Sequence, residues 1–380
     1  MPTSQDPYRR SRPHLRIVPS FLLTRVPTGN PSTRPVQPVG CVRTPSKPMR
    51  NLPLTALTFL IATSTVTDIL AQRRGRRDRG STQELSQFTH KTVEFPAPST
   101  RGSGTYGIYL PKSYADKKNA QRTYPLVIWL HGMRGSSRRF RSGGSSTLDK
   151  MRKADKIPDL ILVTPSASSR PTYIDRGRGQ NEESLILKDL MAHVEKNYRV
   201  AKERHRRAIM GVSMGALGAM KMALKYPKLF GAVAVHSSPI LTVDPDNLGR
   251  YRRFASQIFG DPIDKKEWAK EIPIAILSIK KPKDLAGLRI YFDAGSNDRY
   301  GFGPTNVEFS KQLKKSKFKH TFNYIKGGGH SWGTDSIQRA MQMSFPFVAK
   351  GFAGKPAEKT VKKPTEKPKA VKGRQSGADK

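Results

Sequence analysis

Residues 206–218 read Arg-Arg-Ala-Ile-Met-Gly-Val-Ser-Met-Gly-Ala-Leu-Gly. The segment begins with a short apolar run, passes through the pattern G-x-S-x-G, and continues with residues that favour a helix. This order predicts a strand, a sharp turn and a helix, with Ser213 held at the turn. Side chains at Gly211 and Gly215 would crowd the neighbouring strand and helix. The free N–H groups at the start of the helix would point at the same spot, which suits a developing oxyanion.

Short apolar segments on both sides of this stretch alternate with amphipathic ones. Further strands are expected at 92–95, 105–110, 124–130, 160–163, 230–235, 288–293 and 322–325, and helices at 183–198 and 335–347. Short strands alternating with helices predict an α/β fold with a mainly parallel sheet that is covered by helices on both faces. Residues 238–286 break this rhythm with two helical stretches, and we expect them to form a small cap or insertion beside the site.

The sequence outside this body has a different composition. Residues 1–48 are rich in Arg, Pro, Ser and Thr, so they are expected to be disordered or untranslated. Residues 49–71 begin with Met-Arg, continue with an apolar run and end with Ala, which is typical of a secretory signal peptide, although an internal buried segment is the alternative. We expect translation to start at Met49 and a secreted or periplasmic chain to begin near Gln72. Residues 72–91 are a basic linker, 92–349 the folded catalytic domain, and 350–380 a disordered tail rich in Lys and Pro.

Net charge and cysteine content limit the kinds of partner and cofactor that the sequence predicts. The chain has 69 Lys and Arg against 29 Asp and Glu, a formal net charge of +40, and the excess is not confined to the ends. Such a surface favours an anionic partner, for which we expect a polysaccharide rather than nucleic acid; the alternative is a solvated surface without a special partner. Cys41 is the only cysteine, and no spacing of histidines and acids indicates a metal or cofactor site. Asp68 and the threonines near it argue against a stable membrane span.

Polar groups that could act with Ser213 follow later strands. Chemistry in open parallel sheets gathers at the carboxyl ends of the strands, where Asp293, Asp298 and His330 are expected. The chain order Ser213, acid, His330 is the one expected when such a turn sits on this fold. Ser213 would attack a carbonyl, His330 would take its proton, and the acid would orient the imidazole. We prefer Asp298, because it lies out on the loop, whereas Asp293 at the strand end would cap a turn.

Two more histidines follow predicted strands. His131 opens a His-Gly turn that would direct the Met133 N–H toward the oxyanion, with the Met214 N–H as the second donor. This is a structural role, but the position close to the site also makes His131 a candidate for substrate binding. His236 either lines the substrate pocket or is a satisfied loop histidine.

The body of the chain, about residues 92–349, resembles the serine esterases of the α/β-hydrolase superfamily. It is similar to the esterase D or putative-esterase group, which includes feruloyl and acetyl-xylan esterases. The motifs that carry the resemblance are Leu130-His-Gly132, Gly211-Val-Ser-Met-Gly215, Gly295-Ser-Asn-Asp298 and Gly329-His-Ser-Trp332. The resemblance implies a triad of Ser213, Asp298 and His330, oxyanion donors at Met133 and Met214, and Trp332 beside the acyl pocket.

The resemblance and the signal-like segment together predict a secreted carboxylic-ester hydrolase acting on acyl groups of polysaccharide or related esters. One alternative is a serine peptidase of the same superfamily. The other is a basic polymer-binding protein that kept the fold and lost the reaction. Competent residues at all three triad positions favour the esterase.

Overall fold

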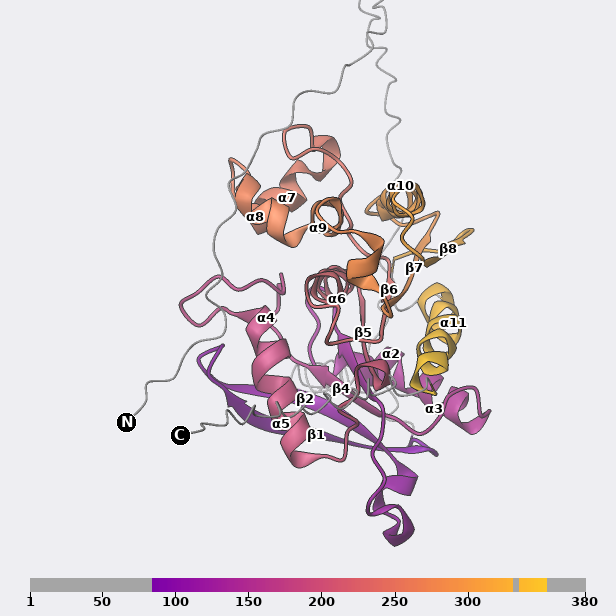
Figure 1. Cartoon of the computed structure of the whole chain (residues 1–380). Helices are drawn as coiled ribbons and strands as arrows, with labels where there is room; N and C mark the ends of the chain where they lie inside the picture. The colour runs from indigo at the N-terminus through magenta and orange to yellow at the C-terminus, as the bar shows by residue number, and fades with distance from the viewer. Residues whose placement is uncertain (1–83, 331–334, 354–380) are drawn as a thin grey trace, which may run out of the picture. The chain divides into compact units, whose positions relative to one another are not determined.

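One sheet of eight strands runs through residues 84–330 and 335–353, the part of the chain that the computed structural model describes (Figure 1). The strand order is β1-β2-β4-β3-β5-β6-β7-β8; β1 pairs antiparallel with β2 and β2 with β4, and all other neighbours are parallel. The predicted mainly parallel α/β sheet is therefore confirmed. The strands are β1 (Phe88–Ala97), β2 (Gly102–Pro111), β3 (Leu126–Leu130), β4 (Ile161–Pro165), β5 (Arg207–Val212), β6 (Ala232–His236), β7 (Arg289–Gly295) and β8 (Thr321–Ile325).

Alternate residues of the central strands enter two different cores. In β3, Ile128 and Leu130 belong to one core, whereas Val127 and Trp129 belong to the other. Because both faces are covered, the strand is apolar throughout rather than alternating.

The predictions for Cys41, the signal peptide, the tail from 354 onward and Trp332 fall outside the described residues.

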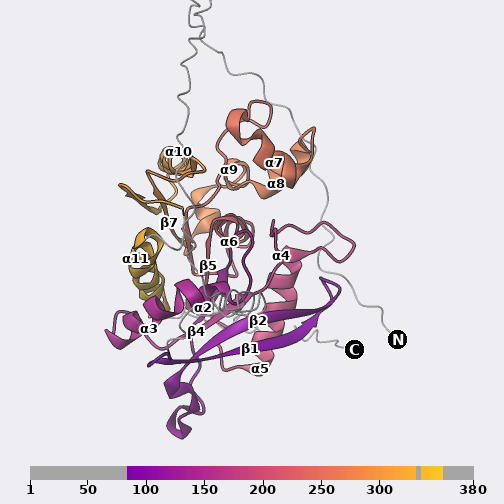
Figure 2. The ribbon, with the colours of Figure 1, turned by 180° about the vertical axis from the view of Figure 1, so that it is seen from behind.

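Helices cover both faces of the sheet. Figure 1 and the reverse view in Figure 2 show α3 and α11 on one side, and α5 and α6 on the other. The helices outside the cap are α2 (Arg139–Gly143), α3 (Ser145–Lys153), α4 (Glu182–Ser184), the π-helical η3 (Leu185–Leu190), α5 (Met191–Asn197), α6 (Met214–Lys225), α10 (Phe302–Lys315) and α11 (Asp335–Phe352), with short 3-10 turns η1 (Lys112–Ala115), η2 (Lys117–Asn119) and η4 (Arg204–Arg206). None of the described helices is long and apolar enough to cross a bilayer.

The last predicted helix is longer than expected. We placed its end at residue 347, but α11 continues to Phe352 despite the proline at 346. Val348 and Phe352 are buried in the core beneath this helix, and their packing extends it. Helix α10 was not predicted; it opens with a Gly-Pro pair that reads as a turn, although proline is well tolerated in a first helical turn.

Residues 238–286 hold three helices, where the sequence predicted two helical stretches. They are α7 (Arg252–Phe259), α8 (Lys265–Glu271) and α9 (Pro273–Ser278), with 3-10 turns η5 (Gly249–Tyr251) and η6 (Pro282–Leu285). Ile272 alone separates α8 from α9, and Pro273 begins the second helix. The apolar pattern therefore runs on from one helix to the next, and the sequence shows them as one helical stretch. We call residues 238–286 the cap. Its own small core includes Ile258 and Trp268 and packs on Met214 and Leu217 of α6.

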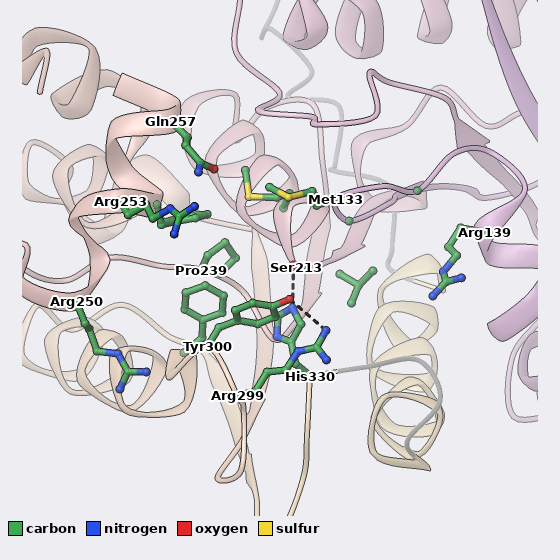
Figure 3. Close-up of a pocket in the computed structure, with 16 residues that line it drawn as sticks. Met133, Arg139, Ser213, Pro239, Arg250, Arg253, Gln257, Arg299, Tyr300 and His330 are labelled. Carbon is green, nitrogen blue, oxygen red and sulfur yellow. Dashed lines mark hydrogen bonds between the residues drawn. The ribbon is translucent and has the colours of Figure 1, made fainter. Parts of the chain in front are cut away.

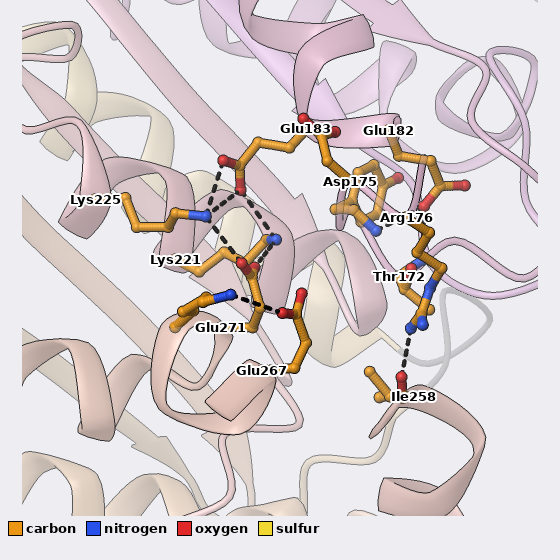
Figure 4. Close-up of polar contacts among 12 residues, drawn as sticks. Thr172, Asp175, Arg176, Glu182, Glu183, Lys221, Lys225, Ile258, Glu267 and Glu271 are labelled. Carbon is orange, nitrogen blue, oxygen red and sulfur yellow. Dashed lines mark hydrogen bonds and ion pairs between the residues drawn. The ribbon is translucent and has the colours of Figure 1, made fainter. Parts of the chain in front are cut away.

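A group of four charges, three of them buried and Lys225 half-buried, also joins the cap to α6 (Figure 4). Lys221 Nζ lies 3.0 Å from Glu183 Oε2 and also pairs with Glu271 of α8. Lys225 Nζ lies 2.9 Å from an oxygen of each glutamate. Burial opposes ionisation of Glu183, but its attraction to Lys221 and hydrogen bonds from Tyr226 and Lys225 outweigh this and hold its pKa below the ordinary value. The cap is thus fixed to the helix that begins at Ser213.

Candidate active site

Ser213 lies at the turn between β5 and α6, as predicted. Its φ of 56° and ψ of −121° put a non-glycine residue in a region that L side chains rarely adopt. The backbone is held there because the Ser213 N–H donates to the carbonyl of His236, at 2.9 Å, and the Ser213 carbonyl accepts from Ala216 in α6. This strained turn presents the hydroxyl at the carboxyl end of the sheet.

The two glycines that flank Ser213 have no room for a side chain. A Cβ on Gly211 would run into the Gly215 carbonyl, and a Cβ on Gly215 would run into the Leu130 carbonyl, both well inside the 3.0 Å that real Cβ atoms keep. The predicted crowding by strand and helix is therefore confirmed. Gly132 is also close, since a Cβ there would lie 3.0 Å from the Ser213 Cβ.

The structure brings Ser213, His330 and Asp298 into one hydrogen-bonded chain, of which Figure 3 shows the Ser213 and His330 side chains. His330 Nε2 lies 2.9 Å from Ser213 Oγ, and His330 Nδ1 lies 2.7 Å from Asp298 Oδ2. The other Asp298 oxygen accepts from the Tyr300 N–H, at 2.9 Å, and the carboxylate is fully buried. Because an ionised carboxylate only accepts, Nδ1 donates to it, and Nε2 is left as the acceptor for the Ser213 hydroxyl.

Asp293, the other candidate acid, pairs with His236 instead. Its Oδ2 lies 2.7 Å from His236 Nδ1, and the second nitrogen of this ring lies 3.2 Å from Ser344 Oγ. All three side chains are buried and none lines the pocket. The expectation that Asp293 caps a turn is wrong, because its side chain is turned inward to the histidine. Of the two alternatives for His236, the structure supports the satisfied histidine, since both ring nitrogens are engaged and the residue does not line the pocket.

His131 is also buried rather than facing the pocket. Its Nδ1 lies 2.8 Å from the Gly132 carbonyl, and its Nε2 accepts from the Ala167 N–H at 3.1 Å. Burial lowers the pKa of this histidine, which favours the neutral ring that these bonds require. The structure thus places His131 in the structural role expected for it, as a brace of the turn before Met133, and not against a substrate.

Met133 and Met214, the two predicted oxyanion donors, both line the pocket with Ser213. Met133 follows the turn after β3, and Met214 is the first residue of α6. No group among the described residues accepts a hydrogen bond from either amide. Their role as oxyanion donors stays a prediction.

A pocket of about 440 Å³ opens over Ser213. Tyr300, Phe302 and Phe254 form an aromatic wall on it, with the Tyr300 ring edge-on to His330 at a centroid distance of 4.6 Å. Four arginines also line the pocket, Arg139, Arg250, Arg253 and Arg299. The sequence predicts Arg139 near the rim of the site, but the aromatic wall and the other three arginines were missed. The sequence does contain a pattern for the part of the lining that comes from the cap. Residues 250, 253, 254 and 257 have the i, i+3, i+4, i+7 spacing of one helix face. Among residues 84–330 and 335–353, no cluster of three or more His, Cys, Asp or Glu could hold a metal ion.

The sheet order and the strained serine turn define an α/β-hydrolase. Comparison with known families is more specific: the "Putative esterase" family matches residues 98–341, and the chain belongs to this family. Esterase Rv1288 of Mycobacterium tuberculosis (strain H37Rv) is 30% identical over 138 residues, which are 35% of this chain and 28% of that protein. An endo-1,4-beta-xylanase/feruloyl esterase of Xylanibacter ruminicola is 26% identical over 155 residues, 39% of this chain and 21% of the relative. The chain therefore spans less than a third of the length of these two curated relatives.

Solved structures share the fold. A ferulic acid esterase superposes with a TM-score of 0.59 and 23% identity, over 71% of this chain and 100% of that one. An S-formylglutathione hydrolase from Agrobacterium tumefaciens gives a TM-score of 0.56 and 17% identity, over 72% and 98% of the two chains. At these identities the likeness shows the common fold.

Proposed function

We propose that this protein is a secreted serine carboxylic-ester hydrolase that removes acyl groups from polysaccharide or related esters through an acyl-enzyme. The observation that carries the proposal is the chain of hydrogen bonds from Ser213 Oγ through His330 to Asp298, at 2.9 and 2.7 Å. Membership of the esterase family supports the reaction class.

In the first half of the reaction, Ser213 Oγ attacks the ester carbonyl carbon while His330 Nε2 takes the hydroxyl proton. The carbonyl oxygen becomes an oxyanion and receives hydrogen bonds from the Met133 and Met214 N–H groups. Asp298 stays ionised and stabilises the imidazolium through Nδ1. The C–O bond to the alcohol then breaks, and His330 returns its proton to the departing alcohol oxygen.

In the second half, water replaces the alcohol. His330 Nε2 takes a proton from the water as it attacks the acyl-enzyme carbonyl, and the same two N–H groups stabilise the second oxyanion. The bond to Ser213 Oγ breaks, the serine regains its proton from His330, and a carboxylic acid leaves. The strained turn at Ser213 keeps Oγ in place through both halves, as a hydroxyl at the start and end and as the ester oxygen of the acyl-enzyme between them.

The substrate class is inferred from three observations. Feruloyl esterases are among the relatives and structural neighbours, and the aromatic wall at Tyr300 and Phe302 suits an aryl or other apolar group. The net charge of +40 favours an acidic polymer. Trp332, which lies outside the described residues, stays a predicted part of the acyl pocket.

The test of the reaction is Ser213→Ala, assayed with 4-nitrophenyl esters of increasing chain length and with feruloylated and acetylated xylan. We expect turnover to fall by about a millionfold, because the nucleophile of a triad cannot be replaced by the remaining groups. Ser278→Ala, an exposed serine on cap helix α9, is the matched control and should keep wild-type activity. Mass spectrometry after treatment with a fluorophosphonate should find the adduct on Ser213. Comparable turnover in the folded Ser213→Ala variant would refute the assignment.

Export is tested separately. Amino-terminal sequencing of the protein recovered from the medium or periplasm should give a start near Gln72. Finding residues 1–48 on the mature chain, or the enzyme only inside the cell, would contradict both the signal peptide and the extracellular role.

A further inference from the structure

Four arginine side chains surround the pocket at Ser213 without an acidic partner. Arg139, Arg250, Arg253 and Arg299 line it, and none of them forms an ion pair with a carboxylate among the described residues. No Asp or Glu of the described chain lines the pocket. The cavity is therefore electropositive, and its guanidinium groups are free for a ligand.

Two of the arginines come from one face of the cap. Arg250 in η5 and Arg253 in α7 are three residues apart on continuous helical turns, so they lie on the same side and face the pocket. Arg252, between them, turns away and pairs with Asp261 at 2.6 Å. The cap thus directs alternate charges of one short segment toward and away from the site.

The Arg250 and Arg299 side chains are held in place beside the proposed catalytic histidine. Arg299 donates to the Tyr300 hydroxyl, at 3.1 Å, and the Tyr300 ring contacts His330. The Arg250 guanidinium packs flat on Gly301, where an added Cβ would lie 3.1 Å from its central carbon. Both cations are therefore fixed to the segment 299–301, directly after Asp298.

The position of these arginines beside His330 determines whether they meet the acyl part or the alcohol part of an ester. The departing alcohol takes its proton from His330 Nε2, so the alcohol must lie on the His330 side of Ser213. Figure 3 shows Arg250 and Arg299 on that side with Tyr300, Arg253 higher up on the cap near Gln257, and Arg139 across Ser213 from all three. Planar guanidinium groups bind carboxylate and sulfate oxygens in pairs, which makes them selective for such anions.

We propose that Arg250, Arg253 and Arg299 select esters whose alcohol part carries a negatively charged carboxylate or sulfate group close to the ester oxygen. The proposal rests on the proposed function, because it uses the assignment of Ser213 and His330. It names the alcohol, such as an acidic sugar unit, as the part of the substrate that the cap recognises.

The test uses acetyl esters that differ in charge on the alcohol alone. 4-Acetoxybenzoate is compared with 4-acetoxybenzamide for the carboxylate, and 4-acetoxybenzenesulfonate with 4-acetoxybenzenesulfonamide as the probe for sulfate. The kcat/KM ratio of each pair is divided by the ratio of the uncatalysed hydroxide rates. The wild-type enzyme should prefer at least one anionic member by about tenfold or more, and the preference should shrink as salt is added. The pair of esters with the larger corrected ratio shows whether the arginines prefer a carboxylate or a sulfate group.

The double variant Arg250→Gln/Arg299→Gln should lower that ratio by about tenfold, because the charged hydrogen bonds to the anionic group are lost. Any loss of kcat/KM that is common to the neutral and the anionic ester cancels in the ratio. Arg253→Gln should lower the ratio by a smaller factor. Arg252→Gln is the matched control: it removes the same charge from the same segment but from the face that does not line the pocket. It should leave the ratio unchanged.

Three outcomes would overturn the inference while the esterase assignment stands. They are a wild-type ratio near one on both pairs, an equal effect of Arg252→Gln and the double variant, or a dependence on these arginines that appears when the charge is on the acyl group, as in 4-nitrophenyl hemisuccinate against the butyrate. If the wild-type enzyme hydrolyses neutral esters and Ser213→Ala does not, the proposed function stands and only the inference about the arginines fails. A wild-type enzyme that cleaves no ester would refute both.

Discussion

His236 and Asp293 form a buried pair in which the ring Nδ1 lies 2.7 Å from the carboxylate Oδ2. His330 makes the same bond to Asp298, at the same distance. The difference lies at the other nitrogen, because His330 Nε2 faces Ser213 whereas His236 Nε2 faces Ser344. The described part of the chain therefore holds two histidine–aspartate pairs, of which one, His330–Asp298, is within reach of the strained serine.

The two aspartates should respond differently to the same substitution. Asp298→Asn should lower kcat by about four orders of magnitude or somewhat less, because an amide lets His330 adopt the wrong tautomer. Asp293→Asn should leave kcat within a few fold and lower the free energy of unfolding by about 1–3 kcal/mol, since a buried hydrogen bond is weakened. Kinetics on one neutral ester and chemical denaturation measure both. A larger loss of kcat in Asp293→Asn would mean that the wrong acid was assigned.

The charged group between the cap and α6 should contribute to stability. Lys221→Met should lower the free energy of unfolding by about 3–5 kcal/mol, because it leaves two buried glutamates with Lys225 as their only remaining lysine. Lys270→Met is the control, on the cap helix α8 that also carries Glu271. Lys270 pairs with Glu267 at 3.4 Å and is exposed, so its loss should cost at most about 1 kcal/mol. Urea denaturation compares the two, and equal losses would contradict a role for burial.

Stability should fall as the pH drops below 6.5, in part through His90. Burial, together with the nearby Arg141 charge, lowers the pKa of His90 from 6.5 to about 4. Between these values the unfolded chain binds a proton that the folded chain does not, so acid favours unfolding and the contribution of His90 is lost progressively from pH 6.5 to 4. Tm measured at pH 7, 6 and 5 should fall less in His90→Gln than in the wild type. Parallel Tm curves for the two proteins would exclude His90 as a cause.

Gly215→Ala should damage the site directly. The new methyl group would collide with the Leu130 carbonyl, which immediately precedes the turn toward Met133. We expect a loss of about 1–3 kcal/mol in the free energy of unfolding, together with a fall in kcat, because relief of the clash moves the serine turn. Ala219→Gly, in the same helix, should cost about 1 kcal/mol through helix propensity but leave kcat nearly unchanged. If both variants keep wild-type kcat, the close packing of Gly215 does not position Ser213.

The sequence located the strands, the serine turn and the three linked residues because each depends on local patterning. Apolar runs mark buried strands, and polar residues that follow such strands meet at one edge of the sheet. The partner of Asp293 could not be read in this way. His236 and Asp293 lie opposite each other on β6 and β7, and this pairing is fixed by strand order and register rather than by local sequence.

The two cap arginines of the pocket, Arg250 and Arg253, were missed for a related reason. Their spacing on η5 and α7 was visible in the sequence, but which face of the cap meets Ser213 depends on how the cap packs. Trp268 and Ile258 in the small cap core and the buried Lys221–Glu271 pair set that orientation. None of these contacts follows from periodicity alone.

The proposed triad and two of the three proposed recognition arginines lie in separate parts of the chain; the third, Arg299, directly follows Asp298. Ser213, Asp298 and His330 follow strands of the sheet, whereas Arg250 and Arg253 belong to the cap, which enters and leaves the sheet between β6 and β7. Exchange of this one insertion between homologous enzymes could therefore change which alcohol is accepted without rebuilding the serine turn. The glutamate at 271 is the part of the insertion that a graft would have to retain, because it pairs with lysines that remain behind on α6.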